Sequence, residues 1–226
     1  MTRASSGGVL LPVTLPSEIL RADYEGASAA VMDIGTNFTL ASAPTVDTGD
    51  YPAITGKTQS FVRATNLTPC YSSVVSDANL TDGDYYAEFW IKNTDLAQTK
   101  YWWGNYTSTS DWAWSLGAAG TDLQLIWAEG AQSQSSGLVM TGGWDHVIVQ
   151  HDVSETTLTF GLNGTLAHFD TSGYTSWPDA TKTYMGIFGN RQSIGWVGKI
   201  GGFRVGTAAQ MPTDALKYRV PTELWS

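Results

Sequence analysis

Residues 157–170 read Thr-Leu-Thr-Phe-Gly-Leu-Asn-Gly-Thr-Leu-Ala-His-Phe-Asp, and this stretch decides the fold. Leu158, Phe160 and Leu162 alternate with threonine and glycine, as expected for a strand with one face against a core. Asn163-Gly164 is the two-residue signal of a type I′ hairpin turn, and the residues after it provide the returning strand. The stretch therefore predicts an antiparallel β-hairpin.

Similar short runs, divided by turn residues, continue along the chain. In residues 85–93 one set of alternate side chains suits a core, and the other set carries Glu88 and Lys92. Aromatic residues make up 12% of the 226-residue chain and charged residues only 15%, which favours strands over surface helices. We expect strands at 29–34, 37–42, 60–65, 85–93, 99–106, 112–118, 123–130, 137–141, 144–153, 157–162, 165–170, 184–189 and 195–206. Within these strands we expect Trp144, Val147, Val149, Phe160, Leu162 and Val205 to be mostly buried.

Charge and composition exclude several classes of protein. Twelve Lys and Arg against 21 Asp and Glu give a net charge of −9, which argues against nucleic-acid binding. No apolar run is long enough for a membrane span, so we expect no membrane partner. The single cysteine, Cys70, excludes an internal disulfide. Residues 1–20 lack the pattern of a signal peptide, so we expect synthesis in a cytoplasm without general secretion.

The second half of the chain carries an ordered set of landmarks. They include the aromatic run Tyr86-Ala87-Glu88-Phe89-Trp90-Ile91-Lys92, the triplet Trp144-Asp145-His146 before a valine-rich run, and the Asn163-Gly164 turn. The others lie at 112–116, 123–127, 185–189 and 198–205.

In this order the landmarks resemble those of the concanavalin A-like jelly rolls of the laminin G-like type, over about residues 28–220. The resemblance implies an all-β fold in which two antiparallel sheets pack face to face as a jelly-roll sandwich. It also implies a structural role for His146. The chain departs from the family at Gly201-Gly202, where acidic residues are frequent.

The resemblance divides the chain into an N-terminal arm at 1–24 and a jelly-roll domain at 25–226. The arm has no strand-length alternation, and ordering it requires contacts that it cannot make with itself. We expect it to lie across a neighbouring subunit, although an arm on its own domain remains the alternative. The candidate assembly residues of the arm are Val9, Leu10, Leu11, Val13 and Leu15.

The sequence predicts no enzyme. None of the six glutamates begins the Glu-x-Asp-x-x-Glu pattern of the laminarinase-like jelly rolls, and glycoside hydrolysis needs such paired carboxylates. No nucleophile elbow and no pair of histidines at metal-binding spacing occurs either.

Aromatic residues are the candidate binding chemistry, because sugars stack on them while amides and carboxylates bind hydroxyl groups. The candidate carbohydrate-binding residues are Trp102, Trp103, Asn105, Tyr106 and Trp112. The alternative is that Trp102 or Trp103 only covers the second sheet.

Calcium is the one cofactor that the resemblance suggests, because laminin G-like and pentraxin-like relatives often hold it at a loop rim. Asp77, Asp82 and Asp84 cluster in one loop, and Asp47 and Asp50 in another. Solvated acidic loops are the alternative, and we expect no other cofactor.

Two functions remain open. The first is a structural protein at the surface of a virion made in a host cytoplasm, as a bacteriophage capsid decoration or tail-associated subunit. Its expected partners are other virion subunits, further copies of itself and a glycan. The second is a carbohydrate-binding lectin or adhesin module outside any virion. A glycoside hydrolase or lyase is disfavoured by the missing carboxylates.

Overall fold

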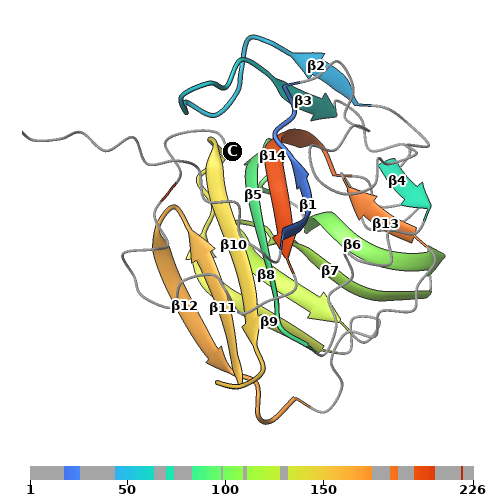
Figure 1. The fold of residues 1–226 in the computed structure, drawn as a ribbon, viewed down its shortest axis with the longest axis vertical. Coiled ribbons are helices and arrows are strands. Elements are labelled where there is room, and N and C mark those ends of the chain that lie inside the picture. Colours follow the sequence, from blue (N-terminus) through green and yellow to red (C-terminus); the bar gives the residue numbers. More distant parts are fainter. Residues whose placement is uncertain are drawn as a thin grey trace, which may run out of the picture.

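Strands of the chain form two antiparallel sheets that pack as a sandwich (Figure 1). The computed structural model describes residues 18–25, 44–63, 70–73, 83–97, 99–108, 111–127, 132–174, 184–187, 196–206 and 220. The predicted all-β, two-sheet antiparallel sandwich is confirmed. The strands expected at 29–34 and 37–42 lie outside the described residues.

The first sheet has eight strands, and its main path runs β12-β11-β10-β5-β14-β3-β2. These strands are β12 (Thr165–Asp170), β11 (Thr157–Leu162), β10 (Asp145–Asp152), β5 (Tyr85–Asn93), β14 (Gly198–Gly206), β3 (Ser60–Arg63) and β2 (Thr45–Asp47). The eighth strand, β1 (Glu18–Ala22), pairs with β14 off this path.

The second sheet has six strands in the order β4-β13-β6-β7-β8-β9. They are β4 (Cys70–Ser73), β13 (Tyr184–Ile187), β6 (Lys100–Ser108), β7 (Asp111–Ala119), β8 (Asp122–Trp127) and β9 (Gln132–Val139). No helix among the described residues is long and apolar enough to cross a membrane.

One face of the first sheet packs against the second sheet and forms the core. Phe89 of β5 lies 5.1 Å from Trp103 of β6, measured between ring centroids. The expected core residues Val147, Val149, Phe160, Leu162 and Val205 are all buried there. Trp144, also expected in the core, is only partly buried.

The alternate residues of the same strands point away from the second sheet, and we call this side the outward face. Strand pairing places Lys92 of β5 beside Lys199 of β14, and Glu88 between Arg204 of β14 and Ile148 of β10. The polar half of the alternation in residues 85–93 therefore becomes a polar row across the middle of the first sheet.

The hairpin between β11 and β12 forms as the sequence predicts. Leu162 pairs with Thr165, and both turn residues have positive φ, 51° at Asn163 and 84° at Gly164. Positive φ at both central positions is the requirement of a type I′ turn, which explains the Asn-Gly pair.

Part of the predicted N-terminal arm belongs to the first sheet. Residues 18–22 form β1, which pairs antiparallel with β14, so that Ala22 lies opposite Phe203 and Glu18 opposite Gly206. For residues 18–22, main-chain hydrogen bonds to a strand of the same chain thus supply contacts that were expected from a neighbour. The candidate assembly residues Val9, Leu10, Leu11, Val13 and Leu15 lie outside the described residues.

Candidate functional site

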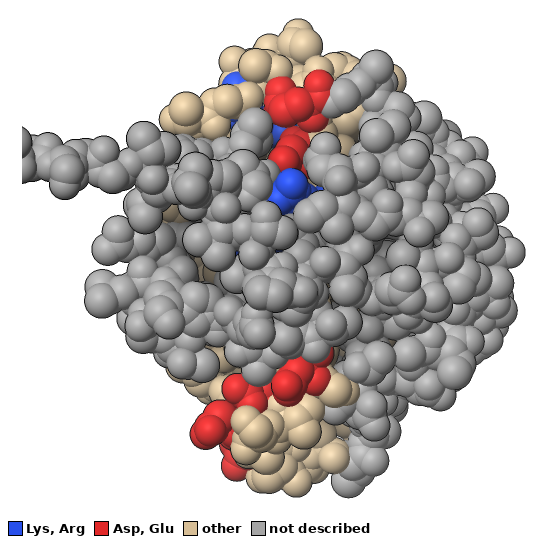
Figure 2. All heavy atoms as spheres, viewed as in Figure 1, with Lys and Arg blue, Asp and Glu red and all other residues tan. Residues whose placement is uncertain are grey.

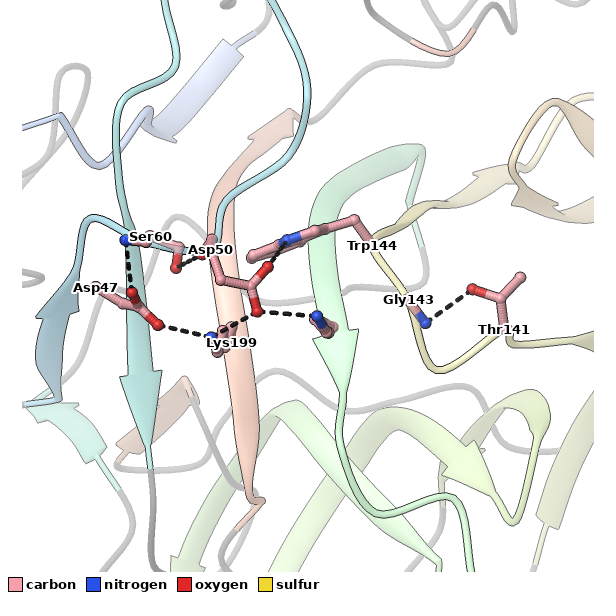
Figure 3. A network of polar contacts seen from close by, with 9 residues as sticks. Asp47, Asp50, Ser60, Thr141, Gly143, Trp144 and Lys199 are labelled. Carbon is pink, nitrogen blue, oxygen red and sulfur yellow. Dashed lines mark hydrogen bonds and ion pairs between the residues drawn. The ribbon is translucent and has the colours of Figure 1, made fainter.

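A cluster of charged side chains and one indole lies on the outward face, at the end of the first sheet where β2 and β3 lie (Figures 1 and 3). Its members are Asp47, Asp50, Lys92, Trp144 and Lys199, which we call the Asp50 cluster. Asp47 ends β2, and Asp50 lies in the bend after it. The lysines come from β5 and β14, and Trp144 immediately precedes β10.

Close packing of a loop on the sheet brings Asp50 to this place. Pro52, two residues after Asp50, is buried against Gly201 of β14. A Cβ atom at Gly201 would lie 2.4 Å from Cγ of Pro52, so any other residue there would push the loop away. The glycine that departs from the family pattern therefore has a structural reason. Ser60 Oγ also holds the loop by donating a 2.7 Å hydrogen bond to the carbonyl of Asp50.

The carboxylate of Asp50 organises the cluster (Figure 3). Its Oδ1 accepts a 2.8 Å hydrogen bond from Trp144 Nε1. Its Oδ2 accepts from Nζ of Lys92 at 2.8 Å and from Nζ of Lys199 at 2.6 Å. Lys199 also donates to Oδ2 of Asp47 at 2.6 Å. One carboxylate therefore fixes the positions of two ammonium groups and an indole.

These contacts shift the pKa values of Asp47, Asp50 and Lys199, and each shift favours the charged form of the group. Burial raises the pKa of Asp50, but hydrogen bonds from Lys199, Lys92 and Trp144 outweigh it and hold that pKa well below its usual range. The hydrogen bond from Lys199 and that from the Gly49 amide lower the pKa of Asp47. Burial lowers the pKa of Lys199, but its bonds to Asp47 and Asp50 produce a net increase. Asp47, Asp50 and Lys199 are therefore charged at neutral pH.

The cluster is accessible to a ligand. The side chains of Asp50 and Lys92 are 31% and 27% exposed, and Trp144 is partly buried. Tyr51, next to Asp50 in the chain, is 37% exposed. An ammonium group has three protons to donate, and Lys92 gives one of them to a described acceptor. The arrangement thus offers oriented hydrogen-bond donors beside the indole of Trp144.

A second polar cluster on the outward face is closed to ligands. Glu88 Oε1 lies 2.5 Å from His146 Nε2, and Glu88 Oε2 accepts from Arg204 Nε at 2.5 Å. The side chains of Glu88 and His146 are only 2% and 1% exposed, and the ring of Trp90 lies 5.1 Å from that of His146. Burial raises the pKa of Glu88, but the charges of Arg204 and His146 and their hydrogen bonds lower it to about 2. This buried ion pair links β5, β10 and β14, in agreement with the structural role expected for His146.

Three of the five residues that were predicted to bind carbohydrate are not exposed. Trp102, Trp103 and Asn105 are all buried, so their predicted place on an exposed platform is wrong. A bulge in β6 is the reason. Tyr101 pairs with Gly117 and Trp103 pairs with Leu116, which leaves Trp102 as an extra residue without a partner on β7 in the strand register.

Both tryptophans consequently belong to one core. Trp102 packs near Trp196, with ring centroids 6.2 Å apart, and Trp103 lies 4.5 Å from Trp114. The alternative, in which these residues cover the second sheet, is the better description. Tyr106 and Trp112 lie opposite each other on β6 and β7, but their side chains are outside the described part of the chain.

The aspartates considered for calcium have other partners where they are described. Asp47 and Asp50 hold Lys199, and Asp84 Oδ1 accepts from the amide of Val153 at 2.9 Å. Asp77 and Asp82 lie outside the described residues. In the described part of the chain, no three His, Cys, Asp or Glu side chains lie where they could hold one metal ion together.

Sequence reasoning grouped Asp47 and Asp50 as a possible calcium loop but did not connect them to Lys92, Lys199 or Trp144. The alternation in residues 85–93 placed Lys92 on the polar side of its strand, which is a second signal that points to this face. Trp144 was expected in the core, but it is only partly buried. Nothing local connects Asp50 to Trp144, which lies 94 residues away in the chain.

No family model and no curated protein sequence matches the chain. Solved structures with the same fold do match. The binding domain of botulinum neurotoxin serotype D has a TM-score of 0.58 at 15% identity, and the match covers 89% of this chain and 49% of that one. The binding domain of Paraclostridial Mosquitocidal Protein 1 has a TM-score of 0.61 at 12% identity, covering 89% of this chain and 51% of that one. The chain thus spans about half the length of these toxin domains.

A carbohydrate-binding module from Ruminococcus gnavus is covered almost completely. This CBM40 of the IT-sialidase, solved with α2,3-sialyllactose, has a TM-score of 0.55 at 11% identity, covering 70% of this chain and 94% of that one. At identities this low, the likeness shows a shared fold alone, a two-sheet β-sandwich.

Proposed function

We propose that this protein is a non-catalytic carbohydrate-binding module and that the Asp50 cluster is its sugar site. The single observation that carries the proposal is that one carboxylate, Asp50, orients Lys92, Lys199 and Trp144 at a partly exposed end of the sheet. A sugar is recognised by an aromatic ring against its C–H face and by directional hydrogen bonds to its hydroxyl groups. The cluster supplies both kinds of contact.

Proteins of the same fold support a sugar ligand. The Ruminococcus gnavus module is bound to sialyllactose, and a botulinum neurotoxin D domain is in complex with N-acetylneuraminic acid. The likeness concerns the fold, so the position and chemistry of the site come from this chain.

The charge states at the cluster argue for binding without catalysis. A general acid in glycoside hydrolysis needs a raised pKa, so that its carboxyl group holds a proton to donate. Asp47 and Asp50 have lowered pKa values because Lys199 bonds to both. Both are therefore carboxylates that hold lysines, and neither is a proton donor.

The virion role stays a prediction. Its main argument was an arm lying on a neighbour, and β1 removes residues 18–22 from the segment available for that contact. A virion subunit with this lectin-like fold remains compatible with a sugar site. Detection of the chain in purified virions by mass spectrometry would support the virion role, and its absence from them would contradict it.

A glycan array followed by calorimetry tests the proposed function. We expect the wild-type protein to bind a set of oligosaccharides, and the Trp144→Ala variant to bind them at least about tenfold more weakly. Val153→Ala is the matched control, because Val153 is 45% exposed in the turn between β10 and β11 and belongs to no part of the cluster. Equal binding by the wild type and Trp144→Ala would contradict the site, and no binding to any glycan would contradict the function.

A further inference from the structure

We propose that the Asp50 cluster takes an uncharged sugar and discriminates against acidic sugars such as sialic acid, an inference that rests on the proposed carbohydrate-binding function. It differs from what the ligands of the solved sandwiches would suggest, and it follows from how charge is distributed on this chain.

The charges inside the cluster cancel. The ammonium groups of Lys92 and Lys199 face the carboxylates of Asp47 and Asp50, at distances of 2.6 to 2.8 Å. Two positive and two negative charges leave no net charge for an anionic ligand to neutralise. The lysines can still donate hydrogen bonds to hydroxyl groups, which carry no charge.

The other described cations of the first sheet and the segments next to it are also paired. Arg21 lies 3.8 Å from Asp23, Lys57 lies 2.8 Å from Glu25, and Arg204 bonds to the buried Glu88. Among the residues of this sheet whose side chains are described, which do not include Arg63, every arginine and lysine therefore has a carboxylate partner. The carboxylate of an acidic sugar would lose water at the cluster without gaining an uncompensated cation, which is unfavourable.

The electrostatic potential of the rest of the protein also disfavours anionic ligands. The whole chain has a net charge of −9. Figure 2 shows acidic side chains at both ends of the face in view, accompanied by basic side chains only at the upper end. The described carboxylates around the turns at the opposite end from β2 and β3 are Asp84, Asp152, Glu155 and Asp170. Their potential repels anions, within the reach that salt screening allows.

The experiment compares matched neutral and acidic probes on the wild-type protein. An array carries neutral oligosaccharides, lactose among them, each beside its sialylated counterpart, such as sialyllactose. We expect the wild type to bind neutral members at least about fivefold more tightly than their sialylated counterparts. Equal or tighter binding of the sialylated member would overturn this inference and leave the proposed function intact. No binding to either class would overturn the proposed function, and this inference with it.

A charge variant separates a local effect from a general one. Asp47→Asn removes one of the two partners of Lys199 and gives the cluster a net positive charge. We expect it to raise the affinity for the sialylated probe relative to the neutral one by about fivefold. Asp170→Asn changes the net charge of the protein equally at the opposite end and should leave that ratio unchanged. If Asp47→Asn and Asp170→Asn had the same ratio of sialylated to neutral affinity, the charge balance within the cluster would have no role in the selectivity.

Discussion

The carboxamide of Asn163 donates a 2.7 Å hydrogen bond from Nδ2 to Oδ1 of Asp145, and so joins a hairpin turn to the first residue of β10. Its Oδ1 accepts a 2.8 Å hydrogen bond from the amide of His146. Asp145 is buried and accepts two further bonds from Thr141. The Trp144-Asp145-His146 and Asn163-Gly164 landmarks, 17 residues apart, are therefore two halves of one structural contact.

Replacing Asn163 with glycine isolates the role of this carboxamide, because glycine keeps the positive φ of the turn. We expect Asn163→Gly to lower the free energy of unfolding by about 1–3 kcal/mol, since Asp145 loses a donor and the His146 amide loses its acceptor. Urea denaturation measures the change. Thr156→Gly is the control, because Thr156 also has positive φ, 49°, in an exposed turn. It should change stability by less than about 0.5 kcal/mol, and an equal loss in both variants would contradict a specific role for Asn163.

A substitution at Phe160 tests how tightly the core is packed. It is fully buried on β11, and its ring meets that of Phe169 edge-on at 5.9 Å. Truncation leaves a cavity in a packed interior, so Phe160→Ala should lower the free energy of unfolding by about 3–5 kcal/mol. Val153→Ala, at a site that is 45% exposed, should change it by less than about 0.5 kcal/mol. A loss below about 1 kcal/mol for Phe160→Ala would contradict its place in the core.

Glu88 should make the stability of the sandwich depend on acid pH. Arg204 and His146 lower its pKa in the folded protein from the usual 4.5 to about 2 against the opposing effect of burial. A lowered folded pKa means that the stabilisation is complete above the unfolded pKa and disappears as pH falls toward the folded pKa. At neutral pH, Glu88→Gln should lower the free energy of unfolding by about 3 kcal/mol, because it removes the buried carboxylate that pairs with the partly buried Arg204.

The difference between wild type and Glu88→Gln should therefore be constant above about pH 5 and shrink between about pH 4.5 and pH 2. Urea denaturation across this range measures it. Glu155→Gln makes the same chemical change at an exposed turn and should show no such trend. A difference that stays constant down to about pH 2 would contradict the ion-pair role of Glu88.

Local patterns predicted the parts of the fold that local forces determine. The alternation of residues 85–93 and the turn at Asn163-Gly164 depend on neighbours in sequence, and both appear as expected. Strand β1 does not depend on its neighbours in sequence. Its residues form a strand because they pair with β14, more than 180 residues later in the chain. This segment contains no alternation that would announce the pairing.

The site escaped prediction for a related reason. Asp50 meets Lys92 and Trp144 across 42 and 94 residues, and only the completed sheet brings them together. The prediction for Trp102 and Trp103 failed for a different reason, because it relied on a local rule that does not hold in β6. Adjacent residues of a regular strand point to opposite faces, and the bulge in β6 cancelled this rule where the prediction depended on it.

The N-terminal strand gives the last prediction, because it replaces the expected arm with a structural element. Tyr24, just after β1, is buried, with its ring 5.0 Å from Phe61 and 5.7 Å from Phe203. Glu25 follows and forms a 2.8 Å ion pair with Lys57, whose side chain is fully buried. Residues 18–25 therefore hold both the edge of β14 and the segment that leads into β3.

Deleting residues 1–25 should destabilise the sandwich relative to deleting residues 1–17, because only the longer deletion removes β1, Tyr24 and the Glu25–Lys57 ion pair. Loss of the Tyr24 side chain alone, in Tyr24→Ala, should lower the free energy of unfolding by about 3 kcal/mol. The longer deletion adds an exposed strand edge at β14, which favours aggregation. Urea denaturation and size-exclusion chromatography measure the two effects. If the longer deletion remained monomeric and as stable as the shorter one, β1 would contribute nothing to the sandwich, and a role for residues 18–25 on a neighbouring subunit would regain its support.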